Sequence, residues 1–333
     1  MALVSEKVEQ ATRQLLASHS GGQRSGMASG GDGVGRWWIY FQERFPLFAH
    51  GPLILAFSLS AVCFSSLLRG SERWPAWPVI AVAFISSLLS FLHLRLADEF
   101  KDLDEDTRYR PYRPVPRGLV TLRELGALWV ATGLIQLALA VFLNYRLVPL
   151  LALTWLYLGL MSREFFCRAW LKSHPFTYMW THMFILPLVD FYATSCDWLS
   201  TSGSPPAGLY WFVLVSFLNG FLIEIGRKIR APDDEESGVG TYSVLWGRRG
   251  AVRGWLFAMA LTGSAAVVAA GKIGFILPVA IVLGMFLAVS TFVGIRFVGN
   301  PQTGKPFELL SGLWTLCLYL LLGVIPLVWK VLA

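Results

Sequence analysis

Nine apolar segments, each near the length that an α-helix needs to cross a lipid bilayer, constrain the fold of this sequence more than any other feature. They cover roughly residues 46–69, 75–98, 122–143, 146–162, 175–195, 208–227, 251–270, 273–295 and 308–331. Charged residues make up only 15% of the 333 residues, whereas a soluble domain carries about a quarter. We therefore predict an all-α polytopic membrane protein with nine transmembrane helices in a bundle.

The basic residues are divided unequally between the two sides that nine helices would define. Of the 28 Lys and Arg, 23 fall on the side of the N-terminus and of the loops after even-numbered helices. Because cytoplasmic loops carry the excess of Lys and Arg, we predict that this side is cytoplasmic. Residues 1–35 are polar and rich in Gly and Ser, and we expect them to form a mobile tail before a membrane domain at 36–333.

The second apolar segment is followed at once by a group of acidic residues. Asp98, Asp102 and Asp106 are spaced by four, so in a continued helix they would lie within about 80° of one face. Glu99 lies one residue away from this face. Acids that converge at a membrane boundary repel one another and lose solvation, which predicts a cation among them.

Basic residues directly after these acids indicate a phosphorylated ligand. Four arginines and three prolines lie between residues 107 and 117, and the prolines are expected to end the helix. Arginine forks grip phosphate oxygens, and Mg²⁺ binds through a few carboxylates, waters and phosphates, so a metal bridged to a phosphate group would suit both sets of residues. The alternative is a solvated connector, although acids spaced by four are uncommon in connectors.

Charged residues also follow the fourth and sixth segments on the same side. Lys172 comes shortly before Pro175, which fixes a short loop, and it is a candidate ligand for phosphate. In the sixth segment, Glu224 lies in the last turn, one helical step from Lys228 and beside Arg227. Acidic and basic residues thus occur together after both the second and the sixth segments, at equivalent points of two even-numbered helices, and this favours one shared site.

Polar residues within the membrane segments are candidates for lining a central cavity that opens to the cytoplasmic side. Asp190 lies far along the fifth segment, where it has either a functional or a structural role. The same two interpretations are open for His182 at mid-depth. Asn219 could face the same cavity, and aromatic residues such as Trp155 and Tyr178 could line it.

These motifs resemble those of the UbiA superfamily of intramembrane prenyltransferases, which has aspartate-rich motifs after the second and sixth of nine helices. The first motif has the pattern Asn-Asp-x-x-Asp-x-x-x-Asp, followed by an Arg-Pro-x-x-Arg-Gly stretch. The sequence matches the pattern with Asp98, Glu99, Asp102 and Asp106, and the stretch with Arg113, Pro114, Arg117 and Gly118. The resemblance covers about residues 40–330.

The second motif departs from the family's pattern of Asp-x-x-x-Asp before a Gly-x-x-Thr turn. Counted back from Gly238, Asp234 fits the second aspartate, but the first position falls on Arg230. Glu224 is the candidate substitute. The resemblance therefore implies a divergent branch with an altered second half of the metal site.

The resemblance implies Mg²⁺-assisted ionisation of an isoprenyl diphosphate inside the bundle. Two or more Mg²⁺ would be held by Asp98, Glu99, Asp102, Asp106, Glu224 and Asp234. The charge on the departing diphosphate would be neutralised by Arg113, Arg117, Lys172, Arg227 and Lys228. Aromatic rings in the cavity would stabilise the allylic cation by π contact and exclude water.

Three functions remain open from the sequence. The first is transfer of the prenyl group to an aromatic or lipid acceptor, and the second is a terpene cyclase reaction that folds the prenyl chain onto its own double bonds. The third is a transporter, because Asp190 and paired loop motifs also suggest repeated halves. The clustering of acids at one face disfavours transport. We expect membrane lipids, and no nucleic acid, as partners.

Overall fold

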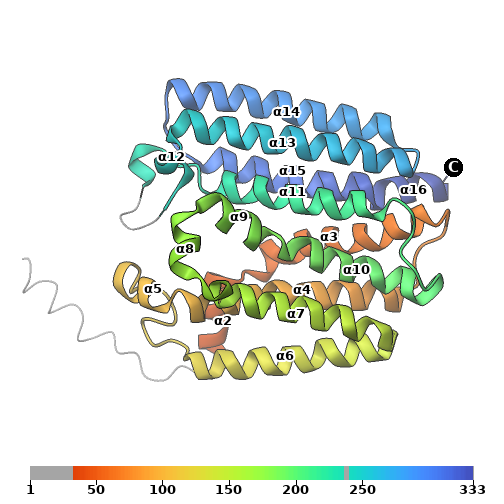
Figure 1. Ribbon diagram of the computed structural model, residues 1–333, viewed down its shortest axis with the longest axis horizontal. Helices are drawn as coiled ribbons and strands as arrows, with labels where there is room; N and C mark the ends of the chain where they lie inside the picture. The colour runs from red at the N-terminus through yellow and green to blue at the C-terminus, as the bar shows by residue number, and fades with distance from the viewer. Residues whose placement is uncertain (1–32, 236–239, 333) are drawn as a thin grey trace, which may run out of the picture.

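The computed structural model describes residues 33–235 and 240–332, and this part of the chain is helical throughout, without a β-strand. Most of the long helices run side by side along the length of the molecule (Figure 1). Eight helical stretches are long and apolar enough to cross a membrane. They are α3 (Leu47–Leu68), α4 (Trp77–Lys101), α6 (Leu122–Leu143), η1 with α7 (Tyr145–Ser162), α11 (Leu209–Arg227), α13 (Gly247–Lys272), α14 (Ile276–Gly299) and α15 with α16 (Lys305–Leu332). The predicted all-α membrane fold is confirmed.

The fifth predicted segment forms two helices instead of one. Helix α9 (Pro175–Met183) and helix α10 (Ile185–Thr201) meet at Phe184. Pro187 lies in the first turn of α10 and has no N–H to donate to the carbonyl of Met183, so the hydrogen-bond ladder is interrupted there. Neither piece alone has the length that was expected for 175–195.

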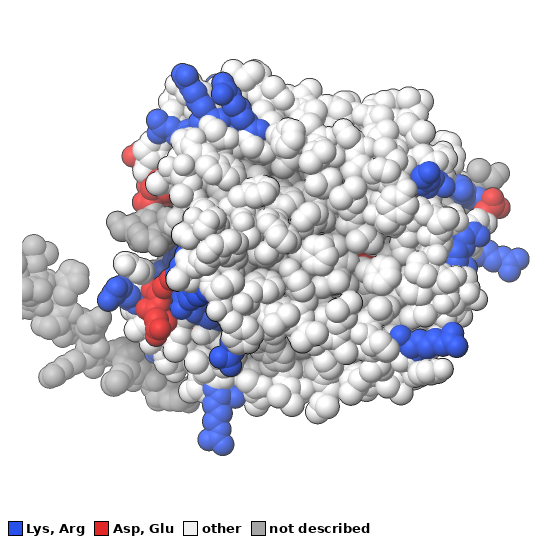
Figure 2. Space-filling model, in the orientation of Figure 1, with Lys and Arg blue, Asp and Glu red and all other residues white. Residues whose placement is uncertain are grey.

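Shorter helices gather at one end of the bundle, on the left of Figure 1, which we call the charged end. They are α2 (Gly33–Arg44), α5 (Leu103–Tyr109), η2 (Glu164–Phe166), α8 (Arg168–Ser173), η3 (Pro232–Asp234) and α12 (Tyr242–Leu245). Charged side chains collect at this end and, in a smaller group, at the opposite end, while the visible face between them is almost entirely uncharged (Figure 2). This distribution is what a bilayer requires of the helices between the two ends.

Helix α2 ties the N-terminal part of the described chain to α4. Its last residue, Arg44, is buried and forms an ion pair with Glu99 near the end of α4. Arg95, one turn earlier on α4, donates a 2.8 Å hydrogen bond to the carbonyl oxygen of Arg44. The predicted tail lies mostly outside the described residues, and its last three residues, 33–35, already belong to α2.

Small residues allow close packing of helices around the charged end. A Cβ on Gly226 of α11 would lie 2.1 Å from Oγ of Ser311 on α15, so only glycine fits between these helices. The amide nitrogen of Asn219 on α11 lies 3.2 Å from the hydroxyl of Thr315 on α15, which adds a buried polar contact. The end of α11 is therefore held rigidly against α15.

Candidate functional site

The first acidic motif lies where α4 gives way to α5. Helix α4 ends at Lys101, and Asp102 occupies the junction with φ −100° and ψ 6°. The amide of Asp102 donates to the carbonyl of Asp98 at 2.9 Å, and that of Asp106 donates to Asp102 at 2.8 Å. The three aspartates thus follow one another at helical spacing, but the expected single continuous helix is broken at Asp102.

Two of the four motif acids are neutralised by arginines of the chain itself. Glu99 is buried against α2 in the ion pair with Arg44. Asp106 is also buried, and its carboxylate lies 2.5 Å from Nη1 of Arg113 and 3.4 Å from Nη1 of Arg110. A buried carboxylate that already has a cationic partner is costly to redirect towards a metal.

The other two acids, Asp98 and Asp102, are more accessible to a cation. The side chain of Asp98 is 41% exposed and has only distant partners, Arg95 at 3.4 Å and Lys101 at 3.8 Å. Burial raises the pKa of Asp102 to about 6; Lys101 opposes this shift, and the neighbouring acids, first Asp98, add to it. A divalent cation bound beside Asp102 would stabilise the ionised form of this carboxyl group.

The C-terminal end of α11, which we call the α11 exit, carries one acidic and two basic residues. The buried carboxylate of Glu224 lies 2.6 Å from Nη2 of Arg227 and 2.6 Å from Nζ of Lys228. The ammonium of Lys228 also lies 5.7 Å from the ring centroid of Tyr242 on α12. This exit therefore has an excess of positive charge and suits an anion.

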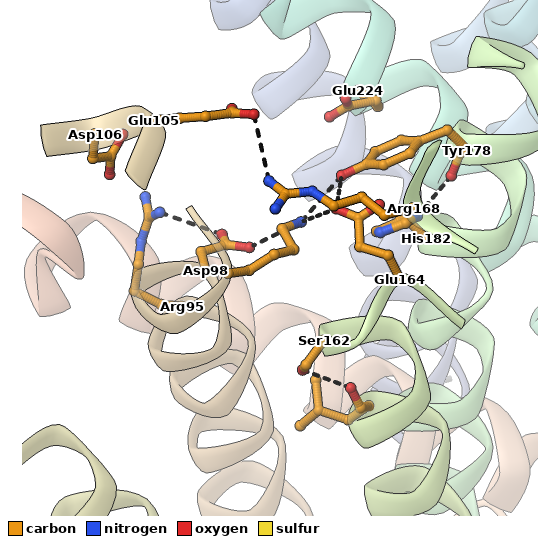
Figure 3. A network of polar contacts seen from close by, with 12 residues as sticks. Arg95, Asp98, Glu105, Asp106, Ser162, Glu164, Arg168, Tyr178, His182 and Glu224 are labelled. Atoms are coloured by element: carbon orange, nitrogen blue, oxygen red, sulfur yellow. Dashed lines mark hydrogen bonds and ion pairs between the residues drawn. The ribbon is translucent and has the colours of Figure 1, made fainter. Parts of the chain in front are cut away.

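The exits of α4 and α11 face a common space beside α9, as Figure 3 shows for Asp98, Tyr178 and Glu224. Tyr178 of α9 lies on the same space, where its hydroxyl accepts a 3.1 Å hydrogen bond from Lys101. The structure thus brings together Asp98, Glu224, Arg227 and Tyr178 of the predicted residues.

His182, one turn along α9, belongs to the same group. Its ring stacks on that of Tyr178 with centroids 3.9 Å apart and lies next to Glu164 (Figure 3). Of the residues predicted to line a cavity, Tyr178 and His182 therefore lie at the site.

Other predicted residues are engaged elsewhere. Asp234 accepts a 3.0 Å hydrogen bond from the amide of Gly304, which lowers the pKa of this carboxyl. Arg117 lies 2.8 Å from Glu43 and donates to the carbonyl oxygen of Tyr112. Asp234 therefore joins η3 to the residue before α15, and Arg117 joins its loop to α2.

Lys172 forms an ion pair with Glu105, and its hydrogen bond lowers the pKa of that carboxyl. This pair is half exposed at the mouth of the site. The remaining predicted residues pack helices together: Asn219 contacts Thr315, and Trp155 donates a 3.0 Å hydrogen bond from Nε1 to Gln136.

Sequence reasoning missed two residues that the structure places beside Tyr178. Lys101 lies inside the first motif, next to Asp102, and its spacing gives no sign of its role. Glu164 lies in η2, where it is buried with its carboxylate 3.9 Å from Nζ of Lys101. The one available signal was an acid placed among Arg163, Arg168 and Lys172 at the end of a membrane segment.

Two of the predicted metal ligands are placed so that they could hold a magnesium ion. In residues 33–235 and 240–332, no group of three or more His, Cys, Asp or Glu side chains forms a ready metal site. Mg²⁺ commonly needs only one or two carboxylates, with waters and substrate phosphates completing its shell. Asp98 and Asp102, one helical turn apart, could supply these two, because the cations nearest Asp98 lie 3.4 Å and 3.8 Å from its carboxylate, whereas Glu224 and Asp234 are already engaged.

The eight apolar helices and the charged end define the chain as a polytopic helical membrane protein. A family model described as the UbiA prenyltransferase family matches residues 58–316, and the chain belongs to this family.

Two solved structures share the fold. One is the apo structure of a UbiA homolog from Aeropyrum pernix K1, with 18% identity over 83% of this chain and 96% of that chain, and a TM-score of 0.62. The other comes from work on digeranylgeranylglyceryl phosphate synthase in membranes. It has 14% identity over 86% of this chain and 99% of that chain, and a TM-score of 0.51. No curated protein matches the sequence.

Proposed function

We propose that this protein is a magnesium-dependent intramembrane prenyltransferase that ionises an isoprenyl diphosphate and transfers the prenyl group to an acceptor. The observation that carries this proposal is the meeting of two unlike helix exits, Asp98 and Asp102 on one side and Glu224 with Arg227 and Lys228 on the other. A diphosphate bound between them would contact a metal through the first exit and fixed cations through the second. The family's description supports prenyl transfer as the reaction.

The bases of the α11 exit would take the charge that develops on the leaving group. Arg227 and Lys228 carry one more positive charge than Glu224 balances, and Lys101 lies on the opposite exit. Charges fixed in place before the reaction stabilise a developing anion more than solvent does. A magnesium ion at Asp98 and Asp102 would supply further charge neutralisation when the C–O bond breaks.

Aromatic rings next to the site would protect the allylic cation. Phe184, at the break between α9 and α10, lies with its ring centroid 5.8 Å from that of Phe217 on α11, and Phe217 lies 4.8 Å from Phe221. Ring faces stabilise a cation by its attraction to their π electrons. They also exclude water that would quench the cation.

We further propose that the charged end faces the cytoplasm. The excess of Lys and Arg on this side supports the orientation, since positive residues are retained there during insertion. The prenyl chain would then extend from the diphosphate into the bundle, between the membrane helices.

The test is release of diphosphate from geranylgeranyl or farnesyl diphosphate by the purified protein in lipid nanodiscs. Release that requires Mg²⁺ supports the proposal. Absence of release with both substrates would overturn it and favour a transporter, which would instead move a substrate across sealed vesicles. Accumulation of a cyclic hydrocarbon without any acceptor would identify a cyclase.

A further inference from the structure

Two buried hydrogen-bond acceptors beside Tyr178 have no partner among the described residues. They are Oε2 of Glu164 and Nε2 of His182. A buried polar atom left without a partner costs about 1–3 kcal/mol, so such atoms at a binding site indicate what the ligand must provide.

Glu164 is held in place by an unusual turn. The residue is 3% exposed, and its Oε1 lies 3.5 Å from the hydroxyl of Tyr178, while Oε2 has no donor. Glu164, Phe165 and Phe166 all have φ between 51° and 59°, in the left-handed region that costs about 1–2 kcal/mol per residue without glycine. This turn redirects the chain after α7 and places the carboxylate beside Lys101.

The Nε2 atom of His182 presents a lone pair and not a hydrogen. Its Nδ1 lies 2.8 Å from the carbonyl oxygen of Tyr178, and because a carbonyl only accepts, Nδ1 carries the hydrogen. In the neutral ring Nε2 is then an acceptor. The residue is 7% exposed, and Figure 3 shows its ring beneath Tyr178, next to Glu164.

We propose that Glu164 and His182 bind a hydroxyl-bearing acceptor substrate and take up its proton. This inference rests on the proposed function and decides between its two chemistries. The hydrocarbon part of a prenyl diphosphate has no N–H or O–H donor and cannot satisfy either atom by a hydrogen bond, so the two atoms favour a second, hydroxyl-bearing substrate over cyclisation of the prenyl chain alone. An alcohol or phenol supplies the missing donor.

The transfer step is balanced with these residues. The bond between C1 and the diphosphate oxygen breaks, and its electron pair leaves with the diphosphate. The acceptor's oxygen forms a new bond to C1, and its O–H bond breaks. The proton passes to this pair of acceptors, which is a general-base role.

The test uses the purified protein in nanodiscs with geranylgeranyl diphosphate, Mg²⁺ and one of two probes, 4-octylphenol or 1-octadecylglycerol, each compared with its methyl ether. Glu164→Gln keeps the size of the side chain and removes its basicity. His182→Phe keeps the stacking on Tyr178 and removes both nitrogens. Glu72→Gln, an exposed acid in a loop far from the site in sequence, is the matched control. Diphosphate release and the mass of the prenylated product are measured separately.

We expect prenylation of a hydroxyl probe and not of its methyl ether. At least one of the two variants should lower this product about a hundredfold, whereas Glu72→Gln should leave it within about threefold of the unaltered protein. Release by the unaltered protein without a prenylated hydroxyl product, a cyclic hydrocarbon, or full transfer by both variants would overturn the inference. Failure of the unaltered protein to release diphosphate would instead refute the proposed function.

Discussion

The ammonium of Lys101 donates a 3.1 Å hydrogen bond to the hydroxyl of Tyr178 and lies 5.7 Å from the centroid of its ring. This contact joins the end of α4 to α9 across the mouth of the site. Replacing Lys101 with Met removes a charged hydrogen bond and one cation beside the proposed diphosphate site, so we expect KM for the prenyl diphosphate to rise about tenfold or more. Tyr178→Phe removes one partner only and should have a smaller effect. Steady-state rates of diphosphate release will measure both.

Asp102→Asn should lower the rate of diphosphate release about a hundredfold or more, because it removes a ligand from the proposed metal site. Asp104→Asn is the matched control, since Asp104 is exposed on α5 two residues away. Both proteins should keep the melting temperature of the unaltered protein in detergent. Retained turnover in Asp102→Asn would show that the metal lies elsewhere.

Glu99→Gln should reduce stability first. Removing one partner of a buried ion pair leaves the other charge unpaired at a cost of about 3–5 kcal/mol, and Arg44 would be left in that state. We expect a lower melting temperature and a loosened α2, detected by faster proteolysis near residue 44. An inactive Glu99→Gln protein with an unchanged melting temperature would instead support Glu99 as a metal ligand.

Metal affinity should depend on pH because the pKa of Asp102 is raised to about 6. Below this pH the carboxyl is protonated and must lose its proton to bind the cation, so affinity for Mg²⁺ falls as pH falls and levels off above about 7. Titration with Mn²⁺, followed by electron paramagnetic resonance between pH 5 and 8, will measure this. The same titration of Asp102→Asn should lose the inflection near pH 6.

Gly226→Ala should disturb the α11 exit. The added methyl would lie 2.1 Å from Oγ of Ser311 and 2.8 Å from Nε1 of Trp255, an overpacking that costs about 1–3 kcal/mol. Gly312→Ala on α15 is the control, because a Cβ there meets nothing within 4 Å. We expect a lower melting temperature for the first variant only, accompanied by weaker diphosphate binding as Glu224 and its partners shift.

The sequence predicted the helices well because long apolar runs leave few alternatives in a membrane. It also predicted from their spacing of four that Asp98 and Asp102 follow one another at helical spacing, which the 2.9 Å hydrogen bond from the amide of Asp102 to the carbonyl oxygen of Asp98 confirms. It could not show that Glu99 faces Arg44, since that pairing depends on how α2 docks against α4. The break at Phe184 had a visible cause in Pro187, but its effect on a membrane segment is decided by neighbouring helices.

Glu164 was beyond prediction for a different reason. Three successive residues in the left-handed region, two of them phenylalanines, have no local sequence signal. The turn is closed by hydrogen bonds from the amides of Phe166 and Cys167 to the carbonyl oxygens of Arg163 and Glu164, both 3.0 Å long, which the sequence does not reveal. The unpartnered atoms of Glu164 and His182 likewise become visible only when both side chains are seen to lie beside Tyr178.

The difference between the two helix exits bears on inhibitor design. Arg227 and Lys228 are covalent parts of the protein, so a chelator that removes divalent ions would leave the basic half of the proposed diphosphate site intact. A non-cleavable bisphosphonate should therefore lose only part of its potency in EDTA. Joining such a head group to a phenol would occupy both substrate positions with one molecule.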